Sequence, residues 1–157
     1  MKIPMTPNGY KLLQAELDRL KKIDRPKNIA DIAEARAHGD LSENAEYSAA
    51  KERQAFIEAR IREIGTKIAE AHVIDTTHFS TEKVVFGATV VLLDIDTNRK
   101  KKYTIVGQDE ANLKNGTISV HSPVAKSLIS KAVGDFVEVE TPTKTMEYEI
   151  LNISFEK

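Results

Sequence analysis

The apolar residues between positions 45 and 72 recur at the spacing of one long amphipathic helix. Isoleucines at 57, 61, 64 and 68 are separated by steps of four, three and four residues, with Lys, Arg and Glu between them. Such steps place side chains along one face of an α-helix as a heptad seam. A helix over 45–72 would be about 42 Å long at ~1.5 Å per residue. Its apolar stripe requires a second helix to cover it.

An earlier stretch supplies that second helix. Its apolar residues also step by four and three, and they are Leu13, Leu17, Leu20, Ile29, Ile32 and Ala33. Pro26 interrupts the pattern, and because proline lacks a backbone donor we expect a kink or local break there. With a short glycine-containing turn after His38, the two stretches predict an antiparallel helical hairpin. An arm with so narrow a core cannot be the whole protein.

The second half of the chain has the pattern of strands. Segments 84–93 and 101–106 are β-branched or alternating, and Asn115-Gly116 is a typical hairpin signal before a strand over 117–120. Ser122-Pro123 supplies an N-cap and a first-turn proline for a short helix over about 123–131. FVEVE and MEYEILNIS then read as two further strands.

These patterns predict an α+β protein. We expect an N-terminal antiparallel α-helical coiled-coil hairpin over 1–75, with an acidic tip near 38–46. A linker over 76–83 would lead to a small antiparallel-sheet domain with one short helix over 84–157.

Composition restricts the function. The 157 residues carry 23 Lys plus Arg against 24 Asp plus Glu, a formal net charge of -1, which argues against binding nucleic acid through bulk positive charge. The absence of cysteine excludes disulfides, thiolate catalysis and Cys-ligated metals. No apolar run approaches the ~20 residues of a membrane span, and the N-terminus has no apolar stretch of signal-peptide length. We expect a soluble cytoplasmic protein.

The turn between the two helices carries Asp40 and Glu43, three residues apart. One interpretation is a capping box, in which Asp40 is the N-cap of the second helix and Glu43 reaches back to its amide. The other is that both carboxylates are offered to a metal ion, and oxygen ligands of this kind suit Mg²⁺ or Mn²⁺. Two carboxylates cannot complete an octahedral shell, so the site would be a half-site completed by a partner or a substrate phosphate. The two interpretations can hold together.

The run ARAHGDLSENAEYSAAKE at 35–52 resembles the tip of the bacterial Gre family of transcript cleavage factors, most closely its GreA branch. The resemblance covers almost the whole chain in order, through IPMTPNGYKLL, VIDTTHF, VFGATV, YTIVGQDEA, ISVHSPVAKSLI and VGDFVEVETP. It implies an N-terminal coiled coil followed by a C-terminal domain with an FKBP-like fold.

The resemblance also implies a function. The globular domain would dock on bacterial RNA polymerase, and the coiled coil would enter the secondary channel. There the factor would rescue backtracked polymerase by stimulating the polymerase's own Mg-dependent cleavage of the nascent RNA 3′ end. Asp40 and Glu43 would be the catalytic acids, sharing a Mg²⁺ with the polymerase, and the free protein would hold no metal. The factor would not be an enzyme by itself, would act as a monomer, and would involve no membrane.

Residues near the acid pair have less specific roles. Glu46 could support the tip as an outer acid, and Ser42 and Asn44 could hydrogen-bond a water or a polymerase loop, although all three also suit ordinary helix-start positions. Family members carry a basic patch on the coiled coil, so three residues are candidates for RNA contact or, equally, for a solvated helix face: Arg36, Lys51 and Arg53. His38 is better explained as a turn residue than as a ligand, because imidazole suits Mg²⁺ poorly.

Two other functions compete with transcript cleavage. A pure binding module would occupy the polymerase channel as an inhibitor, but such homologues differ at the tip. An autonomous prolyl isomerase is suggested only by the FKBP-like fold, which is a weak basis for assigning activity.

Overall fold

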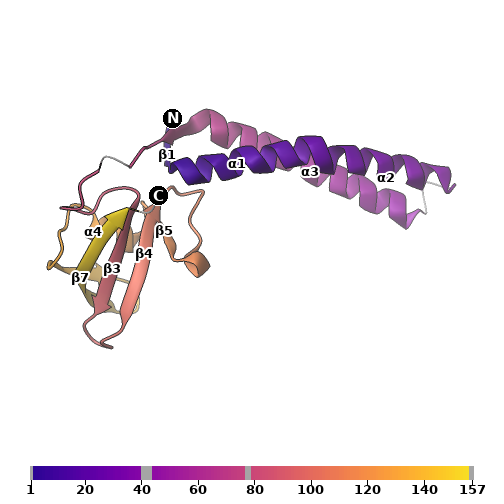
Figure 1. Cartoon of the computed structure of the whole chain (residues 1–157). Helices are drawn as coiled ribbons and strands as arrows, with labels where there is room; N and C mark the ends of the chain where they lie inside the picture. Colours follow the sequence, from indigo (N-terminus) through magenta and orange to yellow (C-terminus); the bar gives the residue numbers. More distant parts are fainter. Residues whose placement is uncertain (1, 40–43, 77–78, 156–157) are drawn as a thin grey trace. The chain divides into compact units, whose positions relative to one another are not determined.

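The computed structural model describes residues 2–39, 44–76 and 79–155. They form two compact units, one over Asn8–Ala71 and the other over Met1–Pro7 together with His72–Lys157. The first is helical and the second contains a five-stranded sheet (Figure 1). The α+β class, with a helical hairpin followed by a small sheet domain, is therefore confirmed. Within the described ranges no helix is long and apolar enough to cross a membrane.

The helical unit is an antiparallel hairpin. Its first side consists of α1 (Pro7–Arg19), a π-helical turn η1 (Leu20–Asp24) and α2 (Arg25–Ala37). Its second side is α3 (Ala45–Glu70), which runs beside α2 and, at 26 residues, is about 39 Å long (Figure 1). The core at the α1 end of the hairpin contains the leucine and isoleucine seam predicted from periodicity, namely Leu13, Leu17, Leu20, Ile57, Ile61, Ile64 and Ile68.

Pro26 does not break the helix. Asp24 and Arg25 keep right-handed helical backbone angles, and the Arg25 amide donates to the carbonyl of Leu20, five residues earlier. The ring of a mid-helix proline collides with the carbonyl four residues before it, here that of Lys22. Because Lys22 lies inside the wider π turn, the collision is relieved without ending the helix.

The π turn also changes which residues are buried. Without the extra residue, the steps through Leu13, Leu17 and Leu20 would continue to 24, 27, 31 and 34, all of which are charged. One inserted residue moves the buried stripe to Asn28, Ile32 and Ala35. Ile29 and Ala33, which periodicity placed among the apolar seam residues, are both exposed, Ile29 to 56%, so that assignment is wrong for these two residues.

The globular unit is built on a sheet with the strand order β5-β4-β3-β7-β6. The bounds are β3 (Ala88–Asp94), β4 (Lys100–Val106), β5 (Thr117–Ser119), β6 (Phe136–Glu140) and β7 (Thr145–Phe155). Alternate residues of the central strands and helix α4 (Pro123–Leu128) enclose the core. The predicted cap of α4 is confirmed, since the Ser122 hydroxyl accepts from the Ala125 amide.

The prediction of a β-hairpin turn at Asn115-Gly116 is wrong. These residues end a 3-10 turn, η2 (Leu113–Asn115), after which Gly116 has the left-handed angle φ 76°. β5 then runs parallel to β4, with Thr104 opposite Thr117, so the sheet is mixed. Parallel neighbours need a crossover connection, which the 107–116 segment supplies, and glycine here closes a helical turn.

The N-terminal strand belongs to the globular unit. β1 (Ile3–Met5) pairs with β2 (Ala71–Val73), and Met5 is buried. The Glu110 carboxylate accepts from the amide and the hydroxyl of Thr6 and from the Gly107 amide. These contacts fix the segment that directly precedes α1.

Candidate functional site

The distal end of the hairpin, where α2 stops and α3 starts, is the candidate site. α2 ends with His38 as its C-cap, and the His38 amide donates to the Ala35 carbonyl at 3.2 Å. Gly39 follows with φ 118°, a left-handed conformation that glycine adopts without strain. His38 is thus a turn residue, as predicted. Asp40, Ser42 and Glu43 lie outside the described residues.

Asn44 is the N-cap of α3. Its side-chain oxygen Oδ1 accepts from the Tyr47 amide at 3.1 Å, and its Nδ2 donates to the Ala35 carbonyl of α2 at 2.8 Å. One carboxamide therefore both starts α3 and ties it to the end of α2. The capping-box interpretation, with Asp40 as the N-cap, is wrong because α3 begins at Ala45 and is capped by Asn44.

The other described candidates lie on the helix surfaces near this turn. Arg36 places its guanidinium 5.9 Å from the ring centroid of Tyr47, a cation–π distance that holds the cation against the arm. Lys51 donates from Nζ to the side-chain oxygen of Gln54 at 2.8 Å. Glu46 lies exposed in the first turn of α3. Their roles toward metal or RNA stay predictions.

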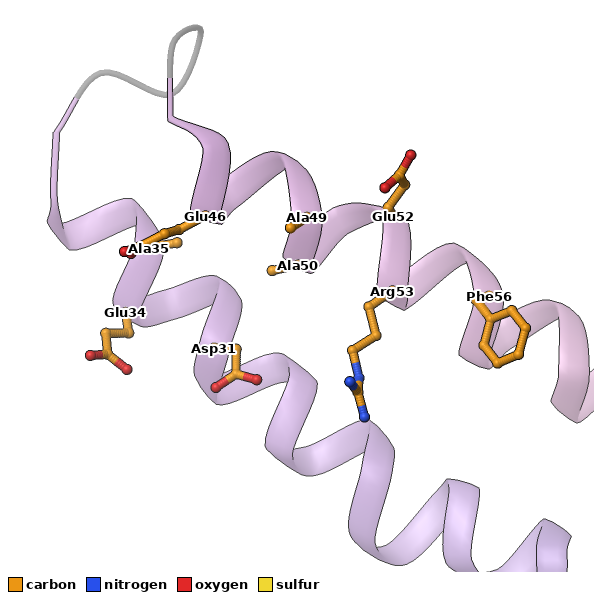
Figure 2. Close-up of a pocket in the computed structure, with 9 residues that line it drawn as sticks. All are labelled: Asp31, Glu34, Ala35, Glu46, Ala49, Ala50, Glu52, Arg53 and Phe56. Atoms are coloured by element: carbon orange, nitrogen blue, oxygen red, sulfur yellow. The ribbon is translucent and has the colours of Figure 1, made fainter.

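A shallow groove runs between α2 and α3 below the turn (Figure 2). Alanines from both helices line it together with charged residues and an exposed aromatic ring, and the set is Asp31, Glu34, Ala35, Glu46, Ala49, Ala50, Glu52, Arg53 and Phe56. Four of these side chains are carboxylates and one is a guanidinium. Arg53 shares the groove with these carboxylates, which lower the positive potential that a phosphate would meet there.

Side chains on α2 and α3 also cross-link the arm. Arg25 forms a bidentate pair with Glu58, through Nε and Nη2 at 2.8 Å each. Asn28, 2% exposed, donates from Nδ2 to the Ala50 carbonyl at 3.0 Å. Asn28 could not be recognised from periodicity, because its place on the seam follows only from the residue inserted by the π turn.

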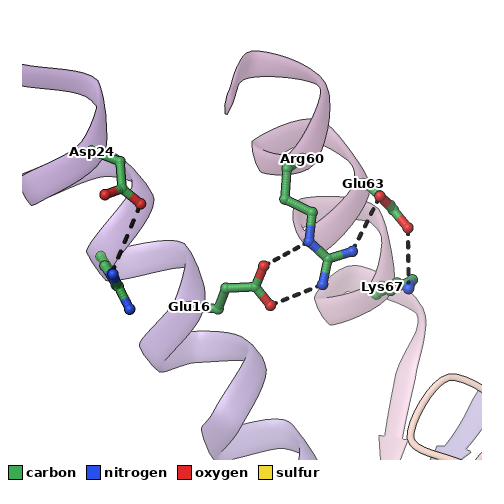
Figure 3. Close-up of polar contacts among 6 residues, drawn as sticks. Glu16, Asp24, Arg60, Glu63 and Lys67 are labelled. Atoms are coloured by element: carbon green, nitrogen blue, oxygen red, sulfur yellow. Dashed lines mark hydrogen bonds and ion pairs between the residues drawn. The ribbon is translucent and has the colours of Figure 1, made fainter. Parts of the chain in front are cut away.

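A second ion-pair group lies on the α1 part of the hairpin (Figure 3). Arg60 contacts Glu16 through two hydrogen bonds, at 2.6 and 2.8 Å, and also pairs with Glu63. These hydrogen bonds lower the pKa of the Glu16 carboxyl below its usual value, against the smaller effect of desolvation. The pKa of Glu63 is lowered by Arg60 and Lys67.

No group of three or more His, Cys, Asp or Glu side chains that could hold a metal ion occurs among the residues the structure describes.

Comparison with known proteins identifies the family. Residues 3–73 match the family described as transcription elongation factor, N-terminal, and residues 79–155 match transcription elongation factor, GreA/GreB, C-term. The chain belongs to the GreA/GreB family of transcription elongation factors.

Individual relatives match over nearly their full length. A transcription elongation factor GreA from Thermodesulfovibrio yellowstonii is 59% identical, covering 99% of this chain and 98% of its own. One from Phenylobacterium zucineum is 56% identical, with 98% of each covered. A solved structure of GreA factor homolog 1 from Thermus thermophilus is 26% identical, with 98% of this chain and 99% of that chain covered and a TM-score of 0.44.

The family match assigns the described tip to the N-terminal part of a GreA/GreB factor. Matched residues 3–73 include the complete hairpin and the acid pair. In this GreA/GreB chain the end of α2 is capped at His38 and the start of α3 is capped by Asn44.

Proposed function

We propose that this elongation factor rescues backtracked bacterial RNA polymerase. The hairpin arm would enter the secondary channel and stimulate the polymerase's own Mg-dependent cleavage of the nascent RNA 3′ end. Asp40 and Glu43 would be the acids that act there. The factor is not a nuclease by itself, and it works in the cytoplasm as a monomer bound to polymerase.

The observation that carries this proposal is the cap of α3. Asp40 and Glu43 had two explanations, helix capping and ligand binding. Asn44 fills the capping role with two hydrogen bonds, to the Tyr47 amide and the Ala35 carbonyl. The acid pair is therefore not required to start α3, and in the turn of a GreA/GreB family member we assign it a ligand role.

The arm is built to deliver such a turn. Polar cross-links join its two sides along the whole hairpin, from Glu16–Arg60 through Arg25–Glu58 to Asn44 and Ala35. Each surface ion pair contributes little to stability by itself, because water screens the charges. Their distribution along a narrow core nevertheless opposes splaying of the two helices.

The donor chemistry of the acid pair fits magnesium. Carboxylate oxygens are preferred Mg²⁺ ligands, and Mg²⁺ is commonly held by one or two carboxylates plus substrate phosphates. Asp40 and Glu43 would supply those two carboxylates, and polymerase with the RNA phosphate would supply the remainder. When bound, the ion would activate water and neutralise charge on the scissile phosphate.

The test uses stalled, backtracked polymerase complexes. Wild type, Asp40→Asn and Glu43→Gln are added with Mg²⁺, and RNA length is followed over time. Asp18→Asn is the matched control, because it removes an exposed carboxylate from α1 of the same arm. We expect rapid shortening with wild type and Asp18→Asn, and little with either tip variant. Both tip variants should still compete with wild type for polymerase.

Three results would contradict the proposal. Normal cleavage by both tip variants would remove the role of the acids. Slower RNA synthesis without cleavage by wild type would favour a channel inhibitor. Hydrolysis of RNA by the protein and Mg²⁺ alone would indicate an autonomous enzyme.

A further inference from the structure

We propose that Asn28 is a positioning residue that sets the register of α2 against α3 and thereby the place of the tip acids. This inference rests on the proposed function for its consequence, but the register itself is a property of the free protein. The observation behind it is a buried polar side chain, 2% exposed, inside the seam of the arm.

The contact made by Asn28 is directional. Its Nδ2 donates to the Ala50 carbonyl across the hairpin at 3.0 Å, and Asn28 lies on the same stripe as Ile32 and Ala35. Sliding one helix by a residue along the other changes the position by about 1.5 Å and the facing direction by about 100°. Because the amide side chain is short, either change breaks the hydrogen bond.

The apolar contacts around Asn28 are less selective. Most large side chains of the arm core are those packed with Leu20, Ile57 and Ile64, whereas the seam nearer the turn buries one large apolar side chain, Ile32, beside the small residues Ala35 and Ala50. Apolar burial is non-directional, and a methyl group packs nearly as well against one alanine as against the next. Within the seam near the turn, a directional polar contact therefore adds a preference for one register that the alanines do not supply.

The neighbouring Arg25–Glu58 pair cannot replace Asn28 in this role. Both side chains are long, and each is 37% exposed. They can follow a shift of one helix by changing rotamers, and water screens the pair. The Asn28 carboxamide, by contrast, is enclosed and joined to the backbone.

Burial of this amide also costs stability. A polar group inside a seam loses hydration that its hydrogen bonds only partly replace, whereas an apolar side chain of similar size would gain by burial. A single buried Asn in a coiled coil is known to specify register at such a cost. We therefore expect Asn28→Leu to make the arm more stable and to lower its stimulation of RNA cleavage.

The experiment compares Asn28→Leu with Gln14→Leu, the same amide-to-leucine change at an exposed position of α1. The chain has no native cysteine that would take up a thiol-reactive spin label. Labels are therefore attached selectively to two introduced cysteines, Ala33→Cys and Ser48→Cys, at exposed positions of α2 and α3. Three quantities are measured: the midpoint of thermal unfolding, the distance distribution between labels, and cleavage in backtracked complexes as a function of factor concentration.

For Asn28→Leu we expect the midpoint to rise by about 4–8 °C. The label distance should shift or broaden by about 1.5 Å or more. The cleavage rate at saturating factor should fall at least about tenfold, as small misplacements of catalytic groups do. The half-saturating concentration should change less than about twofold, and Gln14→Leu should match wild type in distance and cleavage.

An unchanged label distance in Asn28→Leu would overturn the register role. A lower midpoint would show that Asn28 merely stabilises the fold, which also overturns it. Wild-type cleavage together with a shifted distance would refute the link to the acids. If wild type itself stimulates no cleavage, the proposed function fails, while the label distances still decide whether Asn28 sets the register.

Discussion

Replacing Asn44 with alanine should destabilise the start of α3, and the cost follows from its two hydrogen bonds. Loss of an N-cap acceptor, here for the Tyr47 amide, costs about 0.5–2 kcal/mol. Loss of the partly buried bond from Nδ2 to the Ala35 carbonyl costs about 0.5–1.5 kcal/mol more. We therefore expect Asn44→Ala to lower the free energy of unfolding by about 1–3.5 kcal/mol.

Asn44→Asp separates the two contributions. A carboxylate still accepts from the Tyr47 amide and adds a favourable charge at the start of α3, worth about 0.3–1 kcal/mol. It cannot donate to the Ala35 carbonyl, so that bond is lost. The loss in stability should consequently be smaller than for Asn44→Ala.

The assay is urea denaturation combined with amide hydrogen exchange. The free energy of unfolding gives the total effect, and exchange of the Tyr47 amide reports directly on the cap. Protection of Tyr47 should fall in Asn44→Ala and persist in Asn44→Asp.

Asp40→Ala is the decisive comparison because Asp40 was the alternative cap and alanine, unlike asparagine, has no side-chain acceptor to cap a helix. We expect its unfolding free energy to stay within about 0.5 kcal/mol of wild type. If Asp40→Ala destabilised α3 while Asn44→Ala did not, the assignment of the cap would be refuted. The tip acids would then have a structural explanation, and the main support for their ligand role would be lost.

Two further predictions concern stability. The pKa of Glu16 is lowered because Arg60 donates to its carboxylate. The pair therefore stabilises the arm at a pH above the unfolded-state pKa near 4.5, and this stabilisation is lost as the pH falls through the lower folded-state pKa. Glu16→Gln should cost at most about 1 kcal/mol at pH 7 and converge with wild type in urea titrations once the pH has fallen through the folded pKa of Glu16; a gap that persists in acid would contradict this. Gly107→Ala should cost about 1–3 kcal/mol, because the added Cβ would lie 2.2 Å from the Pro4 carbonyl oxygen. Gly65→Ala, whose Cβ meets nothing within 4 Å on α3, should instead gain about 0.5–1 kcal/mol, and equal effects in thermal melts would disprove the close approach.

The hairpin was predictable because periodicity reports burial directly. The isoleucines of α3 are the buried or half-buried residues of its seam. Which residues of α2 face α3 was not predictable in the same way. A proline in a helical pattern indicates a break, and nothing local distinguishes a break from a π turn that inserts one residue. The choice is made by the partner helix, against which Ile32 packs better than Asp31.

Turn chemistry was less predictable, because one residue type serves several local structures. Asn-Gly suits a two-residue hairpin, but at 115–116 it ends a 3-10 turn. Asp-x-x-Glu suits a capping box, yet the cap four residues later is an asparagine that also reaches across to α2. In both places a contact distant in sequence decided between patterns that are locally equivalent.

A protein that supplies only half of a metal site needs little affinity for the metal ion by itself, but it must place its ligands accurately. Two carboxylates bind Mg²⁺ weakly by themselves, so their effect depends on how narrowly the arm confines them. Bonds from a short amide to the backbone, as at Asn28 and Asn44, resist sliding, whereas the long side chains of Glu16 and Arg60 can follow it. The two kinds of cross-link should therefore separate experimentally. Loss of the ion pair should change stability more than cleavage, and loss of an amide contact should change cleavage more than its stability effect accounts for.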